Sequence, residues 1–90
     1  MNKTDTLMWL MRAHEAIRKL PEGTNINSVS LTLYSINGNR INLFVDGPVK
    51  IKNPVARDEK YYENIRSKHV TVSDSNGVDY WWAEDIDDDT

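Results

Sequence analysis

The sequence predicts a single α+β domain, in which an antiparallel sheet of four to five strands (two hairpins) packs with one long N-terminal helix and a shorter middle helix. Apolar residues recur at helical spacing near the N-terminus, and they alternate with polar residues in two later stretches that each surround an Asn-Gly pair. A chain of 90 residues sustains only one core. We therefore expect one domain over residues 1–85, followed by an acidic, disordered tail over residues 86–90.

The N-terminal helix shows the strongest periodicity. Its apolar residues recur at three- and four-residue spacing between Leu7 and Ile17, after a candidate cap at Thr4 or Asp5, and a proline two positions beyond Lys19 should end it there. A second apolar stripe makes the apolar arc wider than the roughly 100° that cover one sheet. This stripe either packs inside the protomer or forms the subunit contact of a homodimer, and it consists of Trp9, Ala13, Ala16 and Leu20.

The first hairpin is predicted around Asn37-Gly38, where strands of alternating apolar and polar residues meet. A three-residue loop that ends in a left-handed Gly38 pairs Leu31 with Leu43 and Val29 with Val45. This register keeps the apolar side chains on one face.

The second hairpin uses the same turn chemistry around Ser75-Asn76-Gly77. A three-residue loop pairs Val72 with Tyr80 and Val70 with Trp82. A two-residue loop would instead oppose two aspartates, at positions 74 and 79, which costs stability. The sequence therefore predicts the three-residue loop, with Gly77 left-handed.

The middle helix is expected to begin at Asn53-Pro54 and to run to about Ser67. An asparagine cap followed by proline is a typical helix start, and Asp58 and Glu59 in the early turns complement the helix dipole. A short edge strand at Val49–Lys52 is expected just before it.

Charge is divided unevenly along the chain. All 11 Lys and Arg residues precede Val70 together with 7 of the 14 acidic residues, whereas the remaining 7 acidic residues lie between Val70 and Thr90. A body of about +4 is thus joined to an end of about −7, and segregated charge of this kind favours a binding partner over a reaction. Alternatively, the acidic end only makes the chain more soluble.

Signals for catalysis and for cofactors are weak in this sequence. His14 and His69 stand alone, without a nearby nucleophile or a second histidine at ligand spacing, and no glycine-rich phosphate loop occurs. We therefore expect a protein that is not an enzyme, with no catalytic residues, no metal and no cofactor. Absent cysteines, a longest apolar run of only five residues and no signal-peptide pattern favour a cytoplasmic protein without a membrane partner.

The leading hypothesis is a small protein-binding module that engages a larger basic protein. Aromatic anchors beside carboxylates provide both affinity and fast association. By analogy of size and charge, such a chain resembles inhibitors from phages or mobile elements that occupy a basic, nucleic-acid-binding surface by mimicking nucleic acid. The expected contact residues are Phe44, Tyr80, Trp81, Glu84, Asp85, Asp87, Asp88 and Asp89.

The alternative hypothesis is a protein that binds single-stranded nucleic acid and carries an autoinhibitory acidic tail. Basic residues interleaved with tyrosines can follow a phosphate backbone and stack on bases. A solvated surface would have the same composition. The residues that would make these contacts are Lys50, Lys52, Arg57, Lys60, Tyr61, Tyr62, Arg66 and Lys68.

Overall fold

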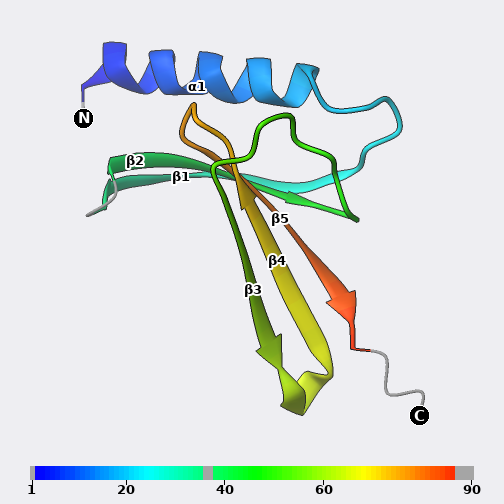
Figure 1. Cartoon of the computed structure of the whole chain (residues 1–90). Helices are drawn as coiled ribbons and strands as arrows, with labels where there is room; N and C mark the ends of the chain where they lie inside the picture. Colours follow the sequence, from blue (N-terminus) through cyan, green and yellow to red (C-terminus); the bar gives the residue numbers. More distant parts are fainter. Residues whose placement is uncertain (1, 36–37, 87–90) are drawn as a thin grey trace.

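The computed structural model describes residues 2–35 and 38–86. One helix, α1 (Lys3–Arg18), lies across a five-stranded sheet (Figure 1). Asn2 caps the helix, because its Oδ1 accepts a hydrogen bond of 2.8 Å from the backbone N–H of Asp5. The cap therefore lies two residues before the earlier of the two predicted positions, whereas the helix ends at Arg18, next to the predicted end.

The sheet confirms the α+β class but is mixed, so the prediction of a purely antiparallel sheet was wrong. Its strand order is β1-β2-β5-β4-β3, and only the β2–β5 pair is parallel. The sequence patterns define pairing within each hairpin, but they do not define the direction in which two hairpins join. The strands are β1 (Ile26–Ser35), β2 (Gly38–Val45), β3 (Ala56–Tyr62), β4 (Ser67–Ser73) and β5 (Val78–Asp85).

The predicted middle helix is absent, because residues 56–62 form strand β3, followed only by the 3-10 turn η1 (Glu63–Ile65). Asn53 adopts a left-handed φ of 54° within the loop before β3, so it does not cap a helix. β3 pairs with β4 along its whole length. A helix here would have had only a thin apolar face to bury. Pairing as a strand satisfies the backbone hydrogen-bonding groups without requiring an apolar face. The segment Val49–Lys52, predicted as an edge strand, belongs to the loop before β3.

The structure confirms the predicted strand pairing of the second hairpin but not that of the first. In the second, Val72 pairs with Tyr80 and Gly77 has a φ of +85°, as predicted. In the first, Leu31 pairs with Ile41, two residues away from the predicted partner. A shift of two residues preserves which face each side chain occupies, so the face assignment holds although the pairing was wrong.

The core lies between α1 and one face of the sheet. Alternate residues of the central strands are buried there, including Leu43, Val70 and Trp82. Two small helical residues, Ala13 and Ala16, pack against them and belong to the same cluster. Small side chains on this stripe let the helix approach the sheet closely.

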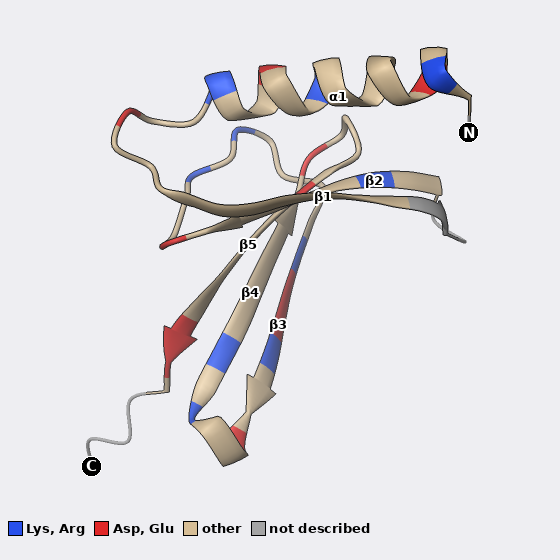
Figure 2. Cartoon of the chain, turned by 180° about the vertical axis from the view of Figure 1, so that it is seen from behind, with Lys and Arg blue, Asp and Glu red and all other residues tan. Residues whose placement is uncertain are grey.

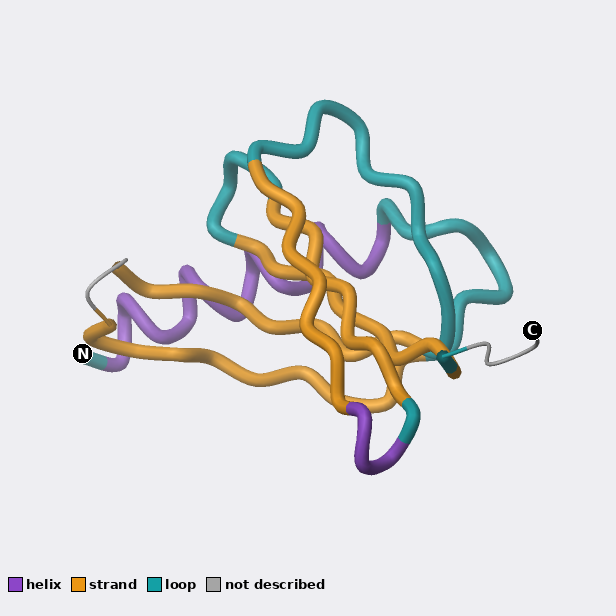
Figure 3. Tube along the Cα trace, turned by 60° about the horizontal axis from the view of Figure 1, so that its bottom comes forward, coloured by secondary structure: helices purple, strands orange, loops and turns teal. Residues whose placement is uncertain are grey.

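The molecule is elongated, since its longest dimension is 52 Å and its radius of gyration is 14.3 Å. A compact chain of this length would have a radius of gyration of about 12 Å. Figures 1 and 3 show the reason: the sheet twists strongly, so the β3–β4 hairpin and the end of β5 run away from the helix that covers β1 and β2. Within the residues that the structure describes, no helix lies on the second face of the sheet.

Candidate functional site

Four aromatic side chains form a row across the sheet face opposite the helix. Phe44 on β2 stacks on Trp81 on β5, with ring centroids 3.9 Å apart and an interplanar angle of 7°. Trp81 lies 5.2 Å from the ring of His69 on β4, which in turn lies 4.6 Å from the ring of Tyr62. All four are half-buried. We call these residues the aromatic row.

Strand pairing creates this row from residues that are far apart in the sequence. The parallel register places Phe44 directly beside Trp81. The antiparallel registers then place Thr71 beside Trp81 and Lys60 beside His69, so that rings from neighbouring strands meet diagonally. The row therefore depends on the parallel β2–β5 pair, which sequence patterns did not predict.

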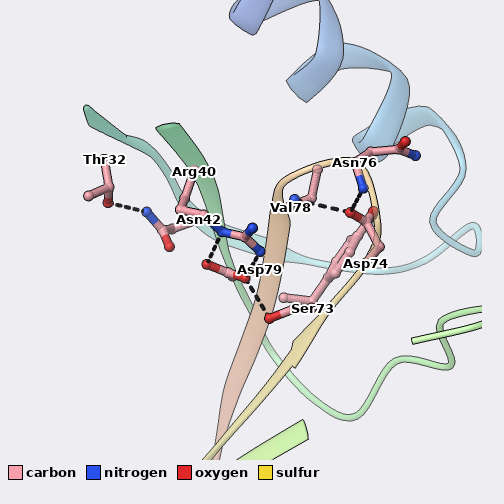
Figure 4. Close-up of polar contacts among 9 residues, drawn as sticks. Thr32, Arg40, Asn42, Ser73, Asp74, Asn76, Val78 and Asp79 are labelled. Atoms are coloured by element: carbon pink, nitrogen blue, oxygen red, sulfur yellow. Dashed lines mark hydrogen bonds and ion pairs between the residues drawn. The ribbon is translucent and has the colours of Figure 1, made fainter. Parts of the chain in front are cut away.

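A polar network holds the strands beside the row (Figure 4). The Arg40 guanidinium donates to both carboxylate oxygens of Asp79, at 3.2 Å from Nε to Oδ2, and Ser73 Oγ donates to Asp79 Oδ1 at 2.6 Å. The hydrogen bond to Asp79 raises the pKa of Arg40. Asn42 Nδ2 donates to Thr32 Oγ1 at 2.7 Å. These contacts connect neighbouring strands and fix the shape of this face.

The described residues of this face carry no excess of positive charge. Arg40 is neutralised by Asp79, and Lys60, whose Nζ lies 5.8 Å from the centroid of the Tyr62 ring, shares its strand face with Asp58. Asp85, at the end of β5, is exposed and pairs in register with Ser67. A shallow hollow between the strands is lined by Asn42, Asp58, Lys60, Tyr62, His69, Thr71, Asp79 and Trp81.

At the projecting end of the sheet, formed by the β3–β4 hairpin and the end of β5, the opposite face carries a second cluster, made of four charged side chains and Trp82. Lys68 Nζ lies 3.2 Å from Glu59 Oε1 and 3.4 Å from Glu84 Oε1. Trp82 Nε1 donates to Glu84 Oε2 at 2.7 Å, and Arg57 Nε donates to Glu59 Oε2 at 3.3 Å. We call these five residues the charged cluster.

The charged cluster shifts the pKa of its ionisable members. Hydrogen bonds from Lys68 and then Arg57 lower the pKa of Glu59, and hydrogen bonds from Trp82 and then Lys68 lower that of Glu84. The bond to Glu59 raises the pKa of Lys68. The ionised forms of all three are therefore favoured in the folded chain.

The residues expected to contact a protein partner fall in three places. Phe44 and Trp81 lie together in the aromatic row, and Asp85 lies exposed at the end of its strand. Tyr80 is 5% exposed beneath the helix, where its hydroxyl donates to Asp74, and burial with the nearby Asp74 raises its pKa to about 12. Glu84 is bound inside the charged cluster. The remaining three, Asp87, Asp88 and Asp89, lie outside the described residues.

The residues expected to contact nucleic acid do not form one surface. Lys60 and Tyr62 lie on the face of the aromatic row, whereas Arg57, Tyr61 and Lys68 lie on the opposite face of the sheet. The other three are in turns and loops: Lys50 and Lys52 before β3, and Arg66 after η1 with a left-handed φ of 52°. Figure 2 shows basic residues spread over several elements.

The stripe considered as a subunit contact faces the sheet of its own protomer. Ala13 and Ala16 are buried, and Trp9 and Leu20 pack against the same core. This is the alternative that the sequence left open, in which the protomer itself covers the stripe.

Sequence reasoning did not find two members of the aromatic row as such. His69 was interpreted only as a histidine that stands alone, without a catalytic or metal-binding neighbour, and Tyr62 was placed on the predicted middle helix. The predicted register of the second hairpin already puts His69 and Trp81 on the same face, because both lie one position away from the Val70–Trp82 pair. That alternation was the available signal for His69, whereas Tyr62 could not be placed without knowing that β3 is a strand.

Comparison of the chain with protein-family models, curated proteins and solved structures finds no match. Within residues 2–35 and 38–86, no group of three or more His, Asp or Glu side chains is arranged to hold a metal ion. The one helix of this part of the chain is neither long nor apolar enough to cross a membrane.

Proposed function

We propose that the chain is a small, non-enzymatic protein-binding module whose aromatic row docks on a larger, basic protein. The contact between Phe44 and Trp81 carries this proposal. Two large aromatic rings, half-buried and stacked on the sheet face opposite the helix, are the kind of anchor that dominates compact protein interfaces.

The charge beside the row favours a basic partner. Asp58 and Asp79 balance the two basic residues of the face, and Asp85 leads directly into the acidic end of the chain. Complementary charge steers two proteins together and fixes their orientation. A nucleic-acid-binding surface on the partner has the required positive charge, so the chain would act as an inhibitor that occupies such a surface.

The binding test compares two aromatic substitutions. Trp81→Ala removes a ring from the row, and Tyr61→Ala removes an exposed ring from the opposite face as a matched control. Immobilised parent, Trp81→Ala and Tyr61→Ala chains are used to capture proteins from the native host, with nuclease present. Loss of a central anchor costs about 2 kcal/mol or more, which is roughly a 30-fold loss of affinity.

We expect one basic protein to be retained by the parent and by Tyr61→Ala but lost with Trp81→Ala, while circular dichroism confirms that all three fold. Retention of the same proteins by all three chains would contradict the proposal.

Binding of single-stranded nucleic acid is the second candidate function, because aromatic rings on a strand surface can stack on bases and Lys60 lies beside Tyr62. The missing positive excess makes it the weaker candidate. A labelled oligothymidine tests it directly. Tight, salt-dependent binding that Trp81→Ala abolishes, and that shortening the acidic tail strengthens, would replace the protein-binding proposal with this one.

A further inference from the structure

The two edge strands of the sheet differ sharply in charge. β3, at one edge, contains Arg57, Asp58, Glu59 and Lys60. β1, at the other edge, has ten residues and contains neither a charged residue nor a proline. Charges and prolines are the usual means by which proteins prevent an edge strand from pairing with another chain. Of the two edges, only β3 is protected in this way.

An apolar side of the helix lies above the unprotected edge. Arg12, Ala16 and Lys19 line a hollow with the β4–β5 turn, so that side of α1 faces away from β1. At 100° per residue, Leu7, Leu10 and Ile17 project from the other side, over β1, on a stripe that also contains Lys3 and His14. Leu7 and Leu10 are about half exposed, at 52% and 47%.

The exposed apolar surface continues from the helix to the strand. Val29 of β1 points toward the helix layer, as its register partner Leu43 does, and yet it is 46% exposed. Leu43 itself is completely buried. At β1, the edge of the sheet, apolar side chains of both the sheet and the helix therefore still face solvent. This is the arrangement expected if the two layers continued into another molecule.

We propose that β1 is a self-association edge, at which two copies of this chain pair antiparallel about a two-fold axis. The paired strands would join two five-stranded sheets into one continuous sheet. Leu7, Leu10 and Val29 of each copy would then pack against the same residues of the other copy. The aromatic row lies on the opposite face and stays accessible, so this proposal is independent of the proposed function.

A second copy fits this edge better than a different protein does. Charges mark an interface for a particular foreign partner, and β1 carries none. In a dimer with two-fold symmetry, each surface patch contacts the same patch of the other copy. A charged patch would therefore meet like charges, so this kind of pairing is easiest for a neutral patch. The β1 edge meets this requirement, and the β3 edge, with four consecutive charged residues, does not.

The oligomeric state is measured by light scattering on the full chain. The parent should have the mass of two chains of 10.4 kDa each. Val29→Lys and, separately, Leu10→Glu should give folded monomers, because each places a charge in the contact at a site that is exposed in the protomer. Val55→Lys is the matched control, since Val55 is 63% exposed just before β3. It should remain dimeric.

Disulfide formation locates the contact even if one charged variant fails to fold. The chain has no cysteine, so single substitutions are unambiguous. Of the Ser28→Cys, Ser30→Cys and Thr32→Cys variants, the one nearest the two-fold axis should cross-link at least several-fold more than Asp58→Cys on β3. A monomeric parent, a dimer that survives both charged substitutions, or equal cross-linking at the two edges would each overturn the proposal.

Discussion

Gly38 and Gly77 adopt the same left-handed backbone conformation in very different surroundings. Their φ angles are +81° and +85°. A Cβ built on Gly38 meets nothing within 4 Å, whereas one built on Gly77 lies 3.3 Å from two ring carbons of Trp9. The glycine in the β4–β5 turn is therefore needed for its backbone and also for the space that the helix fills with a tryptophan.

This difference predicts unequal costs for two identical substitutions. Gly38→Ala should lower the free energy of unfolding by about 1 to 2 kcal/mol through backbone strain alone. Gly77→Ala should lower it by more, up to about 3 kcal/mol, because Trp9 must also move. Urea unfolding of both variants measures the difference. Equal costs would mean that Trp9 does not pack on the turn.

Neighbouring residues on β5 illustrate what could be predicted at a single position. Tyr80 and Trp81 were both expected to contact a partner, but successive residues of a strand point to opposite faces. Tyr80 lies in the core and Trp81 lies in the aromatic row. The predicted register of the second hairpin already implied this separation, since it pairs Tyr80 with the apolar Val72.

At the scale of elements, alternation predicted faces better than it predicted partners. The second hairpin was predicted correctly because a wrong loop would have opposed two aspartates. The first hairpin offers no such penalty: pairing Leu31 with Ile41 or with Leu43 places apolar residues together in both cases. A pattern with a period of two cannot distinguish registers that differ by two residues.

The segment that became β3 was mispredicted for a different reason. Residues 57–60 are strong helix formers or typical of a first helical turn, and local preference favoured a helix. Pairing with β4 overrides this preference, and it places Glu59 beside Lys68 in the charged cluster. This pairing cannot be seen in the helix preferences of residues 57–60 alone, although its partner strand follows directly in the sequence.

The charged cluster makes the projecting end of the sheet sensitive to acid. Glu59 and Glu84 have pKa values below the ordinary 4.5, so their stabilising contribution is complete above about pH 4.5 and is lost as the pH falls through the lowered values. We expect the indole N–H resonance of Trp82, which donates to Glu84, to shift in that acidic range. Nuclear magnetic resonance titration measures it.

Two variants identify the group responsible for that shift. Glu84→Gln keeps an oxygen acceptor for the Trp82 indole but removes the charge, so most of the shift should disappear. Glu63→Gln, on η1, changes one carboxylate outside the cluster and should leave the shift intact. An unchanged titration in Glu84→Gln would mean that another group controls this end of the sheet.

At the scale of the whole molecule, the proposed function predicts that the acidic end and the aromatic row affect different stages of binding. Charges act over a Debye length of about 10 Å at 0.1 M salt, so an acidic chain end affects mainly the rate of encounter with a basic partner. Replacing Asp87, Asp88 and Asp89 with asparagine should lower the association rate with little change in dissociation. Trp81→Ala should mainly speed dissociation. Stopped-flow kinetics with the captured partner at two salt concentrations measures both.

The parallel pair at the centre of the sheet also affects how the chain folds. Strand partners within the antiparallel pairs are at most 19 positions apart, as Ile26 and Val45 are, whereas Ile41 and Val78 are 37 apart. Closing the longer loop costs more entropy, and hairpins form on a microsecond timescale, so the β2–β5 junction is expected to close last. Phe44 and Trp81 meet across this junction. The candidate binding face is therefore completed only in the last step of folding, and a partially folded chain would not bind.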